Sequence, residues 1–377
     1  MSLTDLIREE ISRRGPIPFR DFMERALYHP EHGYYTSGRA AIGRDGDFFT
    51  NVSVGPLFGQ LIAEQISEMW QRLDCPERFT IVEQGADRGQ FAYDVITHLY
   101  FLWPILHERL EYVLVEPSAR AREAQRATLD TFGNCARWVS SPDELDPFIG
   151  VHFSNELIDA FPVHVVKKAG GCWLERHVEW RDSAFQFTDL PLSDAPLQPR
   201  LDLLPTLPDS SETEINLAAL DWIEAIAAKL QRGYILAIDY GWSREEYYRP
   251  ERTTGTLAAY AAHRREPDPL ARPGEIDLTA HVDFTSLAEQ ALNRGLNLEG
   301  FTDQHHFMVG LSRLHFTDSP PLTPTAQKEL RALQTLMHPS SMGRAFKAIC
   351  FTRNTTALPS LAGFAFASDS KRALGLG

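Results

Sequence analysis

Apolar residues recur at helical spacing in the first part of the chain. Leucines and isoleucines stand three or four positions apart in the first 15 residues, as they do on the buried stripe of a helix. Ser2 and Asp5 have the spacing of a capping box, which satisfies free backbone N–H groups at a helix start. Residues 19–27 and 56–73 show the same period. The pattern predicts a helical N-terminal extension over residues 1–75, which we expect to cap the site of the domain that follows.

Short apolar runs separated by helical stretches follow this extension. Runs this short and this apolar are typical of strands buried on both faces of a parallel sheet. Helical stretches lie between them, for example over residues 216–232. We therefore predict an α/β fold with a doubly wound, seven-stranded Rossmann-like sheet. The predicted strands are FTIVE (79–83), YVLVE (112–116), ARWVS (136–140), GVHFS (150–154), GYILAID (233–239), LNLEGF (296–301) and AFKAICFT (345–352).

Two segments interrupt this alternation. Residues 162–215 alternate like hairpin strands and end in a Pro-rich stretch, which predicts a β-rich insertion. Residues 303–340 contain a helical pattern of their own and are predicted to form a second insertion. The Ala/Gly-rich tail, residues 357–377, is expected to pack loosely. The sheet domain is then expected to consist of residues 76–161, 216–302 and 341–356.

The composition narrows the choice of partners and compartment. The chain has 377 residues and a formal net charge of −14, from 51 acidic and 37 basic residues. This balance disfavours nucleic acid or an anionic membrane as the main partner. No apolar run approaches the ~18 residues of a membrane helix. The N-terminus has no apolar signal core, and the four cysteines form no C-x-x-C pair. We therefore expect a cytoplasmic protein without membrane insertion.

Polar residues follow the predicted strands at the edge where doubly wound sheets bind ligands. The first strand runs into an E-x-G-x-x-x-G turn made by Glu83, Gly85 and Gly89. Glycines let the backbone come close to a ligand. The second strand ends in Glu116, whose carboxylate can accept hydrogen bonds from both hydroxyls of a ribose. Strand, glycine turn, helix, strand and terminal acid together predict a nucleoside-containing cofactor.

The spacing of the turn selects among such cofactors. It is not G-x-G-x-x-G, which disfavours NAD, and no G-x-x-x-x-G-K-[ST] motif marks a nucleoside triphosphate site. S-adenosylmethionine is therefore favoured, and a nicotinamide-dependent oxidoreductase is the less favoured alternative. Asp87 stands in the middle of the turn, where a further glycine would be expected. Because Asp tolerates left-handed backbone better than most residues, we expect the turn to persist with weakened cofactor binding.

The stretch SNELIDAFP, which follows the fourth strand, carries candidates for the acceptor side of the site. It places Asn155, Glu156 and Asp159 at the same edge of the sheet. Glu156 and Asp159 are three positions apart, so a helical turn would put both carboxylates on one face. His281 in TAHVDF is a further candidate for catalysis. The adjacent pair His305–His306 has no third ligand at a suitable spacing, so we predict no metal site.

Several long stretches of the sequence resemble the MidA-like family. This family contains predicted S-adenosylmethionine-dependent methyltransferases and the mitochondrial assembly factor for respiratory complex I. The resemblance implies a class I methyltransferase fold with S-adenosylmethionine as cofactor, here in a bacterial protein. It also implies methylation of arginine in a protein partner, with a subunit of respiratory complex I as one candidate. The stretches are GPIPFRDFMERALYHPEHGYY (15–35), IGRDGDFFT (42–50), SNELIDAFPVH (154–164), IDYG (238–241) and DLTAHVDFTSLAEQA (277–291).

The resemblance also implies roles for single residues. Acidic side chains beside the reacting nitrogen would offset the charge of a guanidinium and orient it. The predicted catalytic residues are Glu156, Asp159 and His281. The predicted cofactor-binding residues are Asp47, Thr50, Glu83, Gly85, Asp87, Gly89, Glu116 and Asn155.

The chain departs from the family pattern in the two segments expected to touch the cofactor. The turn carries Gln84 and Asp87 at positions that differ from the usual E-[LF]-G-[PA]-G-x-G, and acids are missing at Ser53 and Gln60. A second hypothesis therefore stands beside the enzyme. In it, the chain is a non-catalytic relative that binds a protein partner as an assembly factor through a degenerate cofactor site.

Overall fold

The computed structural model divides into two compact units. It describes residues 1–38, 50–261, 264–316, 323–339, 342–356 and 359–377. Unit 1 comprises Met1–Phe48, Ile158–Asp221 and Trp242–Asp283. Unit 2 comprises Phe49–Leu157, Trp222–Gly241 and Phe284–Gly377.

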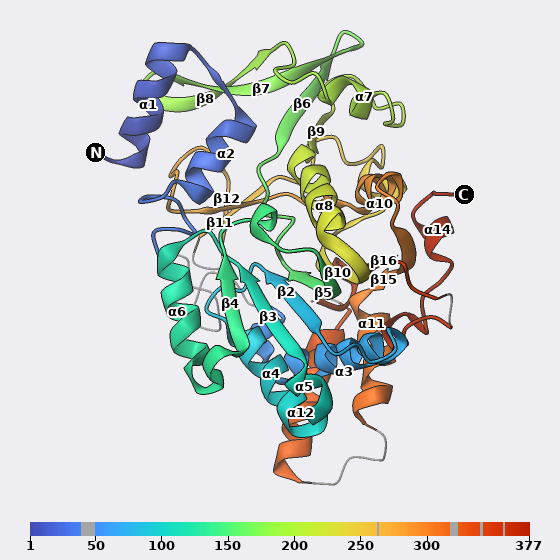
Figure 1. Cartoon of the computed structure of the whole chain (residues 1–377). Helices are drawn as coiled ribbons and strands as arrows, with labels where there is room; N and C mark the ends of the chain where they lie inside the picture. The colour runs from blue at the N-terminus through green and yellow to red at the C-terminus, as the bar shows by residue number, and fades with distance from the viewer. Residues whose placement is uncertain (39–49, 262–263, 317–322, 340–341, 357–358) are drawn as a thin grey trace. The chain divides into compact units, whose positions relative to one another are not determined.

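The large sheet has the strand order of a doubly wound fold, which confirms the predicted class (Figure 1). Seven of its eight strands run in the order β15–β16–β10–β5–β2–β3–β4, and the eighth, β14 (Val282–Asp283), pairs with β10. From β10 to β4 all neighbours are parallel, whereas β16 is antiparallel to both β10 and β15. The chain order reverses between β2 and β5, so the topological switch point lies there. The strands are β2 (Phe79–Gln84), β3 (Leu110–Val115), β4 (Ala136–Val139), β5 (Phe148–Asn155), β10 (Leu230–Trp242), β15 (Asn297–Asp303) and β16 (Phe346–Arg353).

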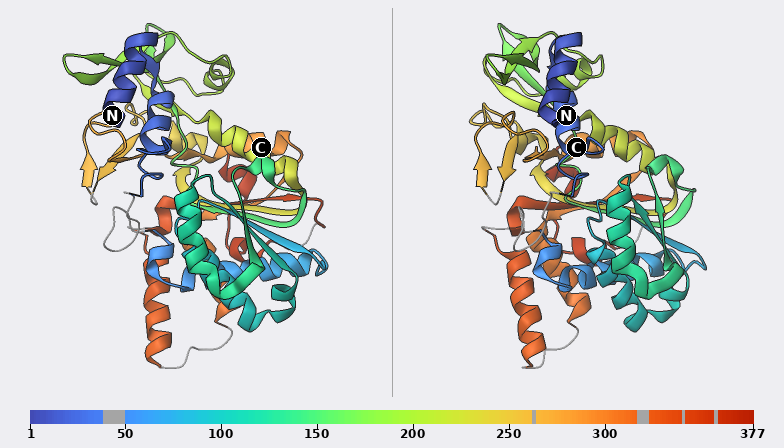
Figure 2. Two further views of the ribbon diagram at one scale, coloured as in Figure 1. Left: turned by 60° about the vertical axis from the view of Figure 1, so that its left-hand side comes forward. Right: turned by 90° about the vertical axis from the view of Figure 1, so that its left-hand side faces the viewer.

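Helices cover both faces of this sheet because its side chains alternate between them (Figures 1 and 2). Phe153 of β5 stacks on Phe91 of α4 (Gln90–Leu102), with ring centroids 4.4 Å apart, and belongs to the core that includes α3 (Leu57–Arg72). The preceding residue, His152, points to the other face and meets Trp222 of α8 (Leu217–Lys229) edge to face. On that second face, Gln290 of α10 (Phe284–Asn293) donates a hydrogen bond to Glu224 of α8.

The later part of the chain adds helices to unit 2. The segment 303–340 supplies α11 (Gln304–His315) and α12 (Pro324–Met337), and α11 packs against α3 and α12. The expectation of a loosely packed tail is wrong, since Leu361, Phe364 and Leu374 are buried. Ser370 of the short helix α14 (Ser370–Ala373) also accepts a hydrogen bond from the backbone N–H of Phe301. In the described parts of the chain, no helix combines the length and hydropathy needed to cross a bilayer. The remaining described α-helices of unit 2 are α5 (Pro104–Glu108), α6 (Ala119–Leu129) and α13 (Met342–Ala345).

Unit 1 joins the first helices to the β-rich segment. α1 (Leu3–Arg14) has the predicted capping box, in which the Asp5 N–H donates to Ser2 Oγ at 3.1 Å and the Ser2 N–H donates to Asp5 Oδ2 at 3.3 Å. Aromatic residues of α2 (Phe19–Tyr28) pack on β8 (Ala184–Leu190). One sheet has the order β1 (Ile17–Pro18), β7 (Cys172–Arg181), β6 (His164–Ala169) and β9 (Glu212–Ile215), with β8 paired to β7. A second has the order β12 (Arg264–Glu266), β11 (Ala258–Ala261) and β13 (Asp277–Thr279). Two short helices, α7 (Leu197–Leu201) and α9 (Arg244–Tyr247), complete the described helices of this unit.

Gly150 in β5 is expected to tolerate no side chain. A Cβ at this position would collide with the backbone carbonyl oxygen of Thr80 in the neighbouring strand β2. Gly150→Ala should therefore force the two central strands apart and lower the free energy of unfolding by about 3 kcal/mol or more. Gly133 is a matched control, since its φ is also positive at 57° but a Cβ there meets open space. Gly133→Ala should cost only backbone strain, about 1 kcal/mol. Urea unfolding of both variants measures the difference, and equal losses would contradict the steric explanation.

Candidate functional site

The turn after β2 exposes backbone at the carboxyl edge of the sheet, beside the switch point. Gly85 and Gly89 have φ values of 83° and 82°, in the left-handed region that favours glycine. A Cβ on Gly85 would lie 3.3 Å from the Leu157 side chain, and one on Gly89 would lie 3.4 Å from Cα of Gln125. Gly85 is exposed, whereas Gly89 is buried and immediately precedes α4. The turn therefore exposes backbone at Gly85, where a ligand can approach closely.

Asp87 adopts the backbone conformation that the turn needs. Its φ is 44°, which confirms that an Asp in this position keeps the left-handed turn. The residue is exposed to solvent, but protein atoms crowd its carboxyl group, and this desolvation raises the pKa of Asp87. The backbone N–H and the charge of Arg88 act in the opposite direction. The turn is thus preserved, with a carboxyl group added at its exposed side.

Glu116 follows β3 directly, and two donors hold its carboxylate. Oε1 accepts from the backbone N–H of Ser118 at 2.8 Å, and Oε2 accepts from Nε2 of Gln125 at 3.2 Å. Burial raises the pKa of Glu116, while these hydrogen bonds lower it and the charge of Asp87 raises it further. A carboxylate oxygen can accept more than one hydrogen bond. The Glu116 carboxylate is therefore pre-oriented and still able to accept from ligand hydroxyls.

Gln125 of α6 links the glycine turn to Glu116, and sequence reasoning missed it. Its Nε2 also donates to the backbone carbonyl of Asp87 at 2.9 Å, and its Oε1 accepts from Nε1 of Trp138 at 2.8 Å. The side chain is fully buried. In the sequence, Gln125 is only a polar residue among the buried positions of a predicted helix. It belongs to no motif with a distinctive spacing. Gln125 is thus a positioning residue that fixes both predicted cofactor contacts at once.

Asn155 and Glu156 at the end of β5 form a hydrogen-bonded network with Asn51. Nδ2 of Asn51 donates to Oδ1 of Asn155 at 2.8 Å. Oε1 of Glu156 accepts from Nδ2 of Asn155 at 2.9 Å and from the backbone N–H of Asn51 at 3.2 Å. Gln304 of α11 donates to Oδ1 of Asn51 at 2.8 Å, and both of these residues are fully buried. The network orients the Glu156 carboxylate through two residues, Asn51 and Gln304, that the sequence did not suggest.

The predicted helical turn through residues 156–159 is wrong. Glu156 has a φ of 52°, which no right-handed helix accommodates, and residues 156–160 form bends and turns. Glu156 belongs to unit 2 and Asp159 to unit 1. Asp159 is buried, and its backbone carbonyl accepts from the N–H of Ala280 at 2.9 Å. The argument for one shared helical face therefore does not apply to these two carboxylates.

Three other predicted cofactor contacts have different outcomes. Asp47 lies outside the described residues. Thr50 is buried, and its hydroxyl lies 2.9 Å from Oγ of Ser53. Glu83 is buried, accepts a hydrogen bond from the Tyr112 hydroxyl at 2.6 Å, and has its pKa raised by burial to about 7. Its carboxyl group is thus engaged inside the protein beneath the glycine turn.

The histidines considered in the sequence, His281, His305 and His306, each contact other residues of the protein. In unit 1, the ring of His281 stacks on Trp242 with centroids 4.1 Å apart, and its backbone N–H donates to Thr256. In unit 2, Nδ1 of His305 lies 2.9 Å from the carbonyl oxygen of Met337, and His306 bonds the carboxylate of Asp303. Stacking fixes the orientation of the His281 ring, and its catalytic role stays a prediction.

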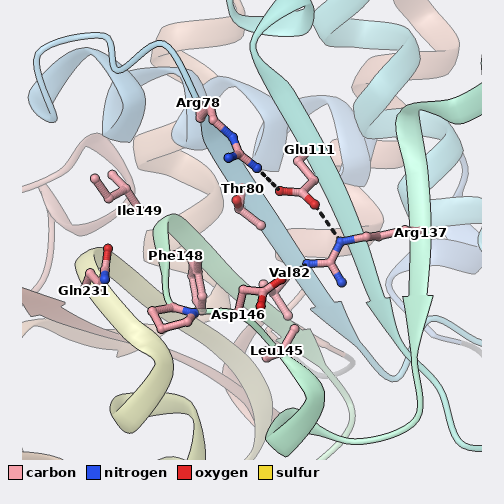
Figure 3. Close-up of a pocket in the computed structure, with 11 residues that line it drawn as sticks. Arg78, Thr80, Val82, Glu111, Arg137, Leu145, Asp146, Phe148, Ile149 and Gln231 are labelled. Atoms are coloured by element: carbon pink, nitrogen blue, oxygen red, sulfur yellow. Dashed lines mark hydrogen bonds and ion pairs between the residues drawn. The ribbon is translucent and has the colours of Figure 1, made fainter.

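A cavity of ≈ 280 Å³ lies at the opposite edge of the sheet (Figure 3). It is lined by residues at or near the amino ends of the parallel strands, including Thr80, Phe148 and Ile149. Inside it, the Glu111 carboxylate lies 3.6 Å from Arg78 and 2.6 Å from Arg137, so these charges offset one another. Because the glycine turn and Glu116 follow the carboxyl ends of their strands, this cavity is separate from the predicted cofactor site.

Comparison with known proteins identifies the family. Residues 61–302 match a family model described as "Putative S-adenosyl-L-methionine-dependent methyltransferase". The chain belongs to this family. It is also 34% identical to a protein from Burkholderia thailandensis whose crystal structure was solved with bound S-adenosyl-homocysteine. The TM-score of that match is 0.88, and it covers 98% of this chain and 96% of the other.

Curated relatives of the family carry a more specific name. The chain is 29% identical to "Protein arginine methyltransferase NDUFAF7 homolog, mitochondrial" of Drosophila melanogaster, over 92% of this chain and 84% of the relative. It is 25% identical to "Protein arginine methyltransferase NDUFAF7, mitochondrial" of Homo sapiens, over 89% of this chain and 80% of the relative. The similarity therefore extends through most of both proteins.

Family and fold together make the protein a methyltransferase that uses S-adenosylmethionine, which confirms the main prediction from the sequence. The described site fits this cofactor. Backbone at Gly85 is exposed beside the switch point, and two donors orient the Glu116 carboxylate. The assignments of single residues to parts of the cofactor stay predictions.

Glu83 is expected to make the protein less stable as the pH rises toward neutrality. Burial raises its pKa from 4.5 to about 7, so between these values the folded protein retains a proton that the unfolded chain has released. The stabilisation is fully present below the unfolded pKa and is lost as the pH rises through about 7, a change of about 3 kcal/mol. Glu83→Gln removes this titration and should flatten the profile. Urea unfolding of wild type and Glu83→Gln at several pH values tests this prediction. If the free energy of unfolding changed with pH in the same way for both proteins, the prediction would be contradicted.

Gln125 is expected to control cofactor affinity through Glu116. Gln125→Met keeps the size of the side chain but removes its donor and acceptor, and should weaken S-adenosylhomocysteine binding by about 1 kcal/mol. Glu116→Gln removes the charged acceptor itself and should cost about 1.5–3 kcal/mol. Gln90→Met is the control, because Gln90 donates to Asp94 on α4 and not to Glu116. Calorimetric titration measures the S-adenosylhomocysteine affinity of all three variants. If the folded Glu116→Gln protein bound S-adenosylhomocysteine as tightly as wild type, the ribose would have to bind elsewhere.

Proposed function

We propose that the protein transfers a methyl group to arginine in a protein partner. The observation that carries this proposal is the Glu156 carboxylate, held at the carboxyl edge of the sheet by Asn51 and Asn155. Glu156 directly follows β5. This strand pairs with β2, which precedes the glycine turn, and the two strands border the switch point. The names of the fly and human relatives, both arginine methyltransferases, support the same acceptor.

The chemistry of arginine explains why a fixed carboxylate is needed. A guanidinium stays protonated in proteins, and the sulfonium of S-adenosylmethionine, which supplies the methyl group, is a second positive charge. The Glu156 carboxylate offsets this repulsion and accepts N–H bonds that aim one guanidinium nitrogen. Two donors fix Oε1 of Glu156, so the carboxylate is oriented before the substrate arrives. The same carboxylate is suited to take the proton that the alkylated nitrogen must release.

The character of the partner follows from charge and from the relatives. A net charge of −14 favours the approach of a basic protein segment. A subunit of respiratory complex I, which the family resemblance suggests, is one candidate acceptor. The acceptor-side roles of Asp159 and His281 remain predictions from the sequence. The relatives are named as mitochondrial, whereas a cytoplasmic location for this chain remains a proposal.

Labelled methyl transfer tests the proposal directly. The purified protein is incubated with S-adenosylmethionine carrying a labelled methyl group and with an extract of source cells that lack the gene. The labelled proteins are then hydrolysed to amino acids. Label in methylarginine is the expected result. Label only in another amino acid would overturn the arginine assignment while leaving the methyltransferase activity in place.

Glu156 is expected to affect turnover and not cofactor affinity. Glu156→Gln removes the charge that offsets the guanidinium, so methyl transfer should fall by about 10²-fold or more. S-adenosylhomocysteine affinity should stay nearly unchanged. Glu144→Gln is the control, since Glu144 is another acid of unit 2 that accepts a backbone N–H bond, from Ser140 at 2.9 Å. If Glu156→Gln abolished S-adenosylhomocysteine binding instead, Glu156 would belong to the cofactor half of the site.

A further inference from the structure

Three potential metal ligands meet among the helices of unit 2, away from the glycine turn. They are Glu64 of α3, His98 of α4 and His315, the last residue of α11. One ligand atom from each side chain lies within 4.8 Å of the other two. Glu64 and His98 are buried, and His315 is partly buried. Buried ionisable side chains from three separate helices thus converge on one small region.

The distances among these side chains bracket those of a zinc site. Oε1 of Glu64 lies 2.6 Å from Nε2 of His98, with which it shares a hydrogen bond, and a ligand atom of His315 lies within 4.8 Å of both. Ligands bound tetrahedrally at zinc distances of about 2.0–2.2 Å lie about 3.4 Å from one another. The 2.6 Å pair must open by about 0.8 Å, and the ligand atom of His315 must close by at most about 1.4 Å from the 4.8 Å limit.

The type and support of the ligands also favour zinc. Two imidazoles and one carboxylate form a known three-ligand zinc set that leaves a fourth position for water. Nε1 of Trp103 donates to the second carboxylate oxygen, Oε2 of Glu64, at 3.3 Å. Such an outer hydrogen bond orients a ligating carboxylate. The partial exposure of His315 provides a side from which an ion and its water can enter.

We propose that Glu64, His98 and His315 form a zinc site that ties α11 to α3 and α4. The site contributes no group that contacts the cofactor or the acceptor. Gln304, which supports Asn51 in the acceptor network, begins the same helix α11. A metal at the other end of α11 would therefore hold in place the helix that supports the Glu156 carboxylate. The prediction of no metal site, made from His305 and His306, concerned different residues of this helix.

Binding of Co²⁺ to the metal-depleted full-length protein tests this site, because Co²⁺ replaces zinc and reports its coordination by visible absorption. We expect one equivalent per chain with the intense absorption of a tetrahedral site, displaced by Zn²⁺. His98→Gln and His315→Gln should each weaken binding by more than about tenfold, since even loss of an outer partner costs about 10–100-fold. His306→Gln is the matched control. It removes a histidine of the same helix that also bonds a carboxylate, at 2.6 Å from Asp303, and it should leave affinity unchanged.

Two further measurements keep the proposal testable if the ligand variants unfold. X-ray absorption of the zinc-loaded wild-type protein should show a zinc ion bound by two imidazoles, with oxygen atoms as its other ligands. Zn²⁺ should also raise the thermal midpoint of the wild-type protein, because an ion that binds the folded state stabilises it. Absence of stoichiometric Co²⁺ binding by wild type, or loss of binding in His306→Gln, would overturn the proposal. So would undiminished binding by a folded His98→Gln or His315→Gln variant.

Discussion

The parallel pairing of β2 with β5 is the contact on which the site depends. The strands lie so close at Gly150 that no side chain fits against the carbonyl of Thr80. Their connections leave in opposite directions along the sheet, which opens the switch point at their carboxyl ends. The glycine turn follows one strand and the Glu156 network follows the other. The groups predicted to bind cofactor and acceptor therefore follow neighbouring strands, because two strands that are distant in sequence are adjacent in the sheet.

Buried amides hold the charged groups at this edge. Gln125 joins Glu116 to the carbonyl of Asp87, and Gln304 joins α11 to Asn51, which in turn binds Glu156. An amide both donates and accepts, so it can fix a carboxylate without adding a charge that would neutralise it. Burial alone would raise the pKa of Glu116, and its donors counteract that effect. The carboxylates are thereby oriented while they keep lone pairs for a ligand.

Asp87 shows how a departure from a family pattern can be absorbed. Its backbone takes the left-handed conformation at a φ of 44°, so the turn that glycine usually makes survives. The cost is electrostatic, because the Asp87 charge acts on the Glu116 carboxylate and raises its pKa. S-adenosylmethionine, which is predicted to bind at this turn, carries a sulfonium and an ammonium that would bring positive charge there. The substitution therefore changes the electrostatics of the site more than its shape.

The sequence alone determined the elements whose signals are local. Short apolar runs predicted the strands of the sheet and period-3.6 patterns predicted the main helices. The placement of Gly85, Gly89 and Glu116 after strands predicted the cofactor edge. These signals suffice because each element buries its own apolar face. The prediction of a helical turn at 156–159 was wrong, because the backbone N–H of Glu156 donates to the carbonyl oxygen of Ile238 on β10.

Only the tertiary structure decided which polar side chains meet. Asn51 and Gln304 are 253 positions apart in the chain, and Gln125 reads from sequence as an ordinary polar residue of a helix. The same holds for Glu64, His98 and His315, which come from three helices and have no ligand spacing. Buried hydrogen bonds depend on the packing of elements and not on local sequence period. The sequence by itself therefore determined which strand ends carry the predicted cofactor groups, and the packing of the helices on the sheet decided which side chains support them.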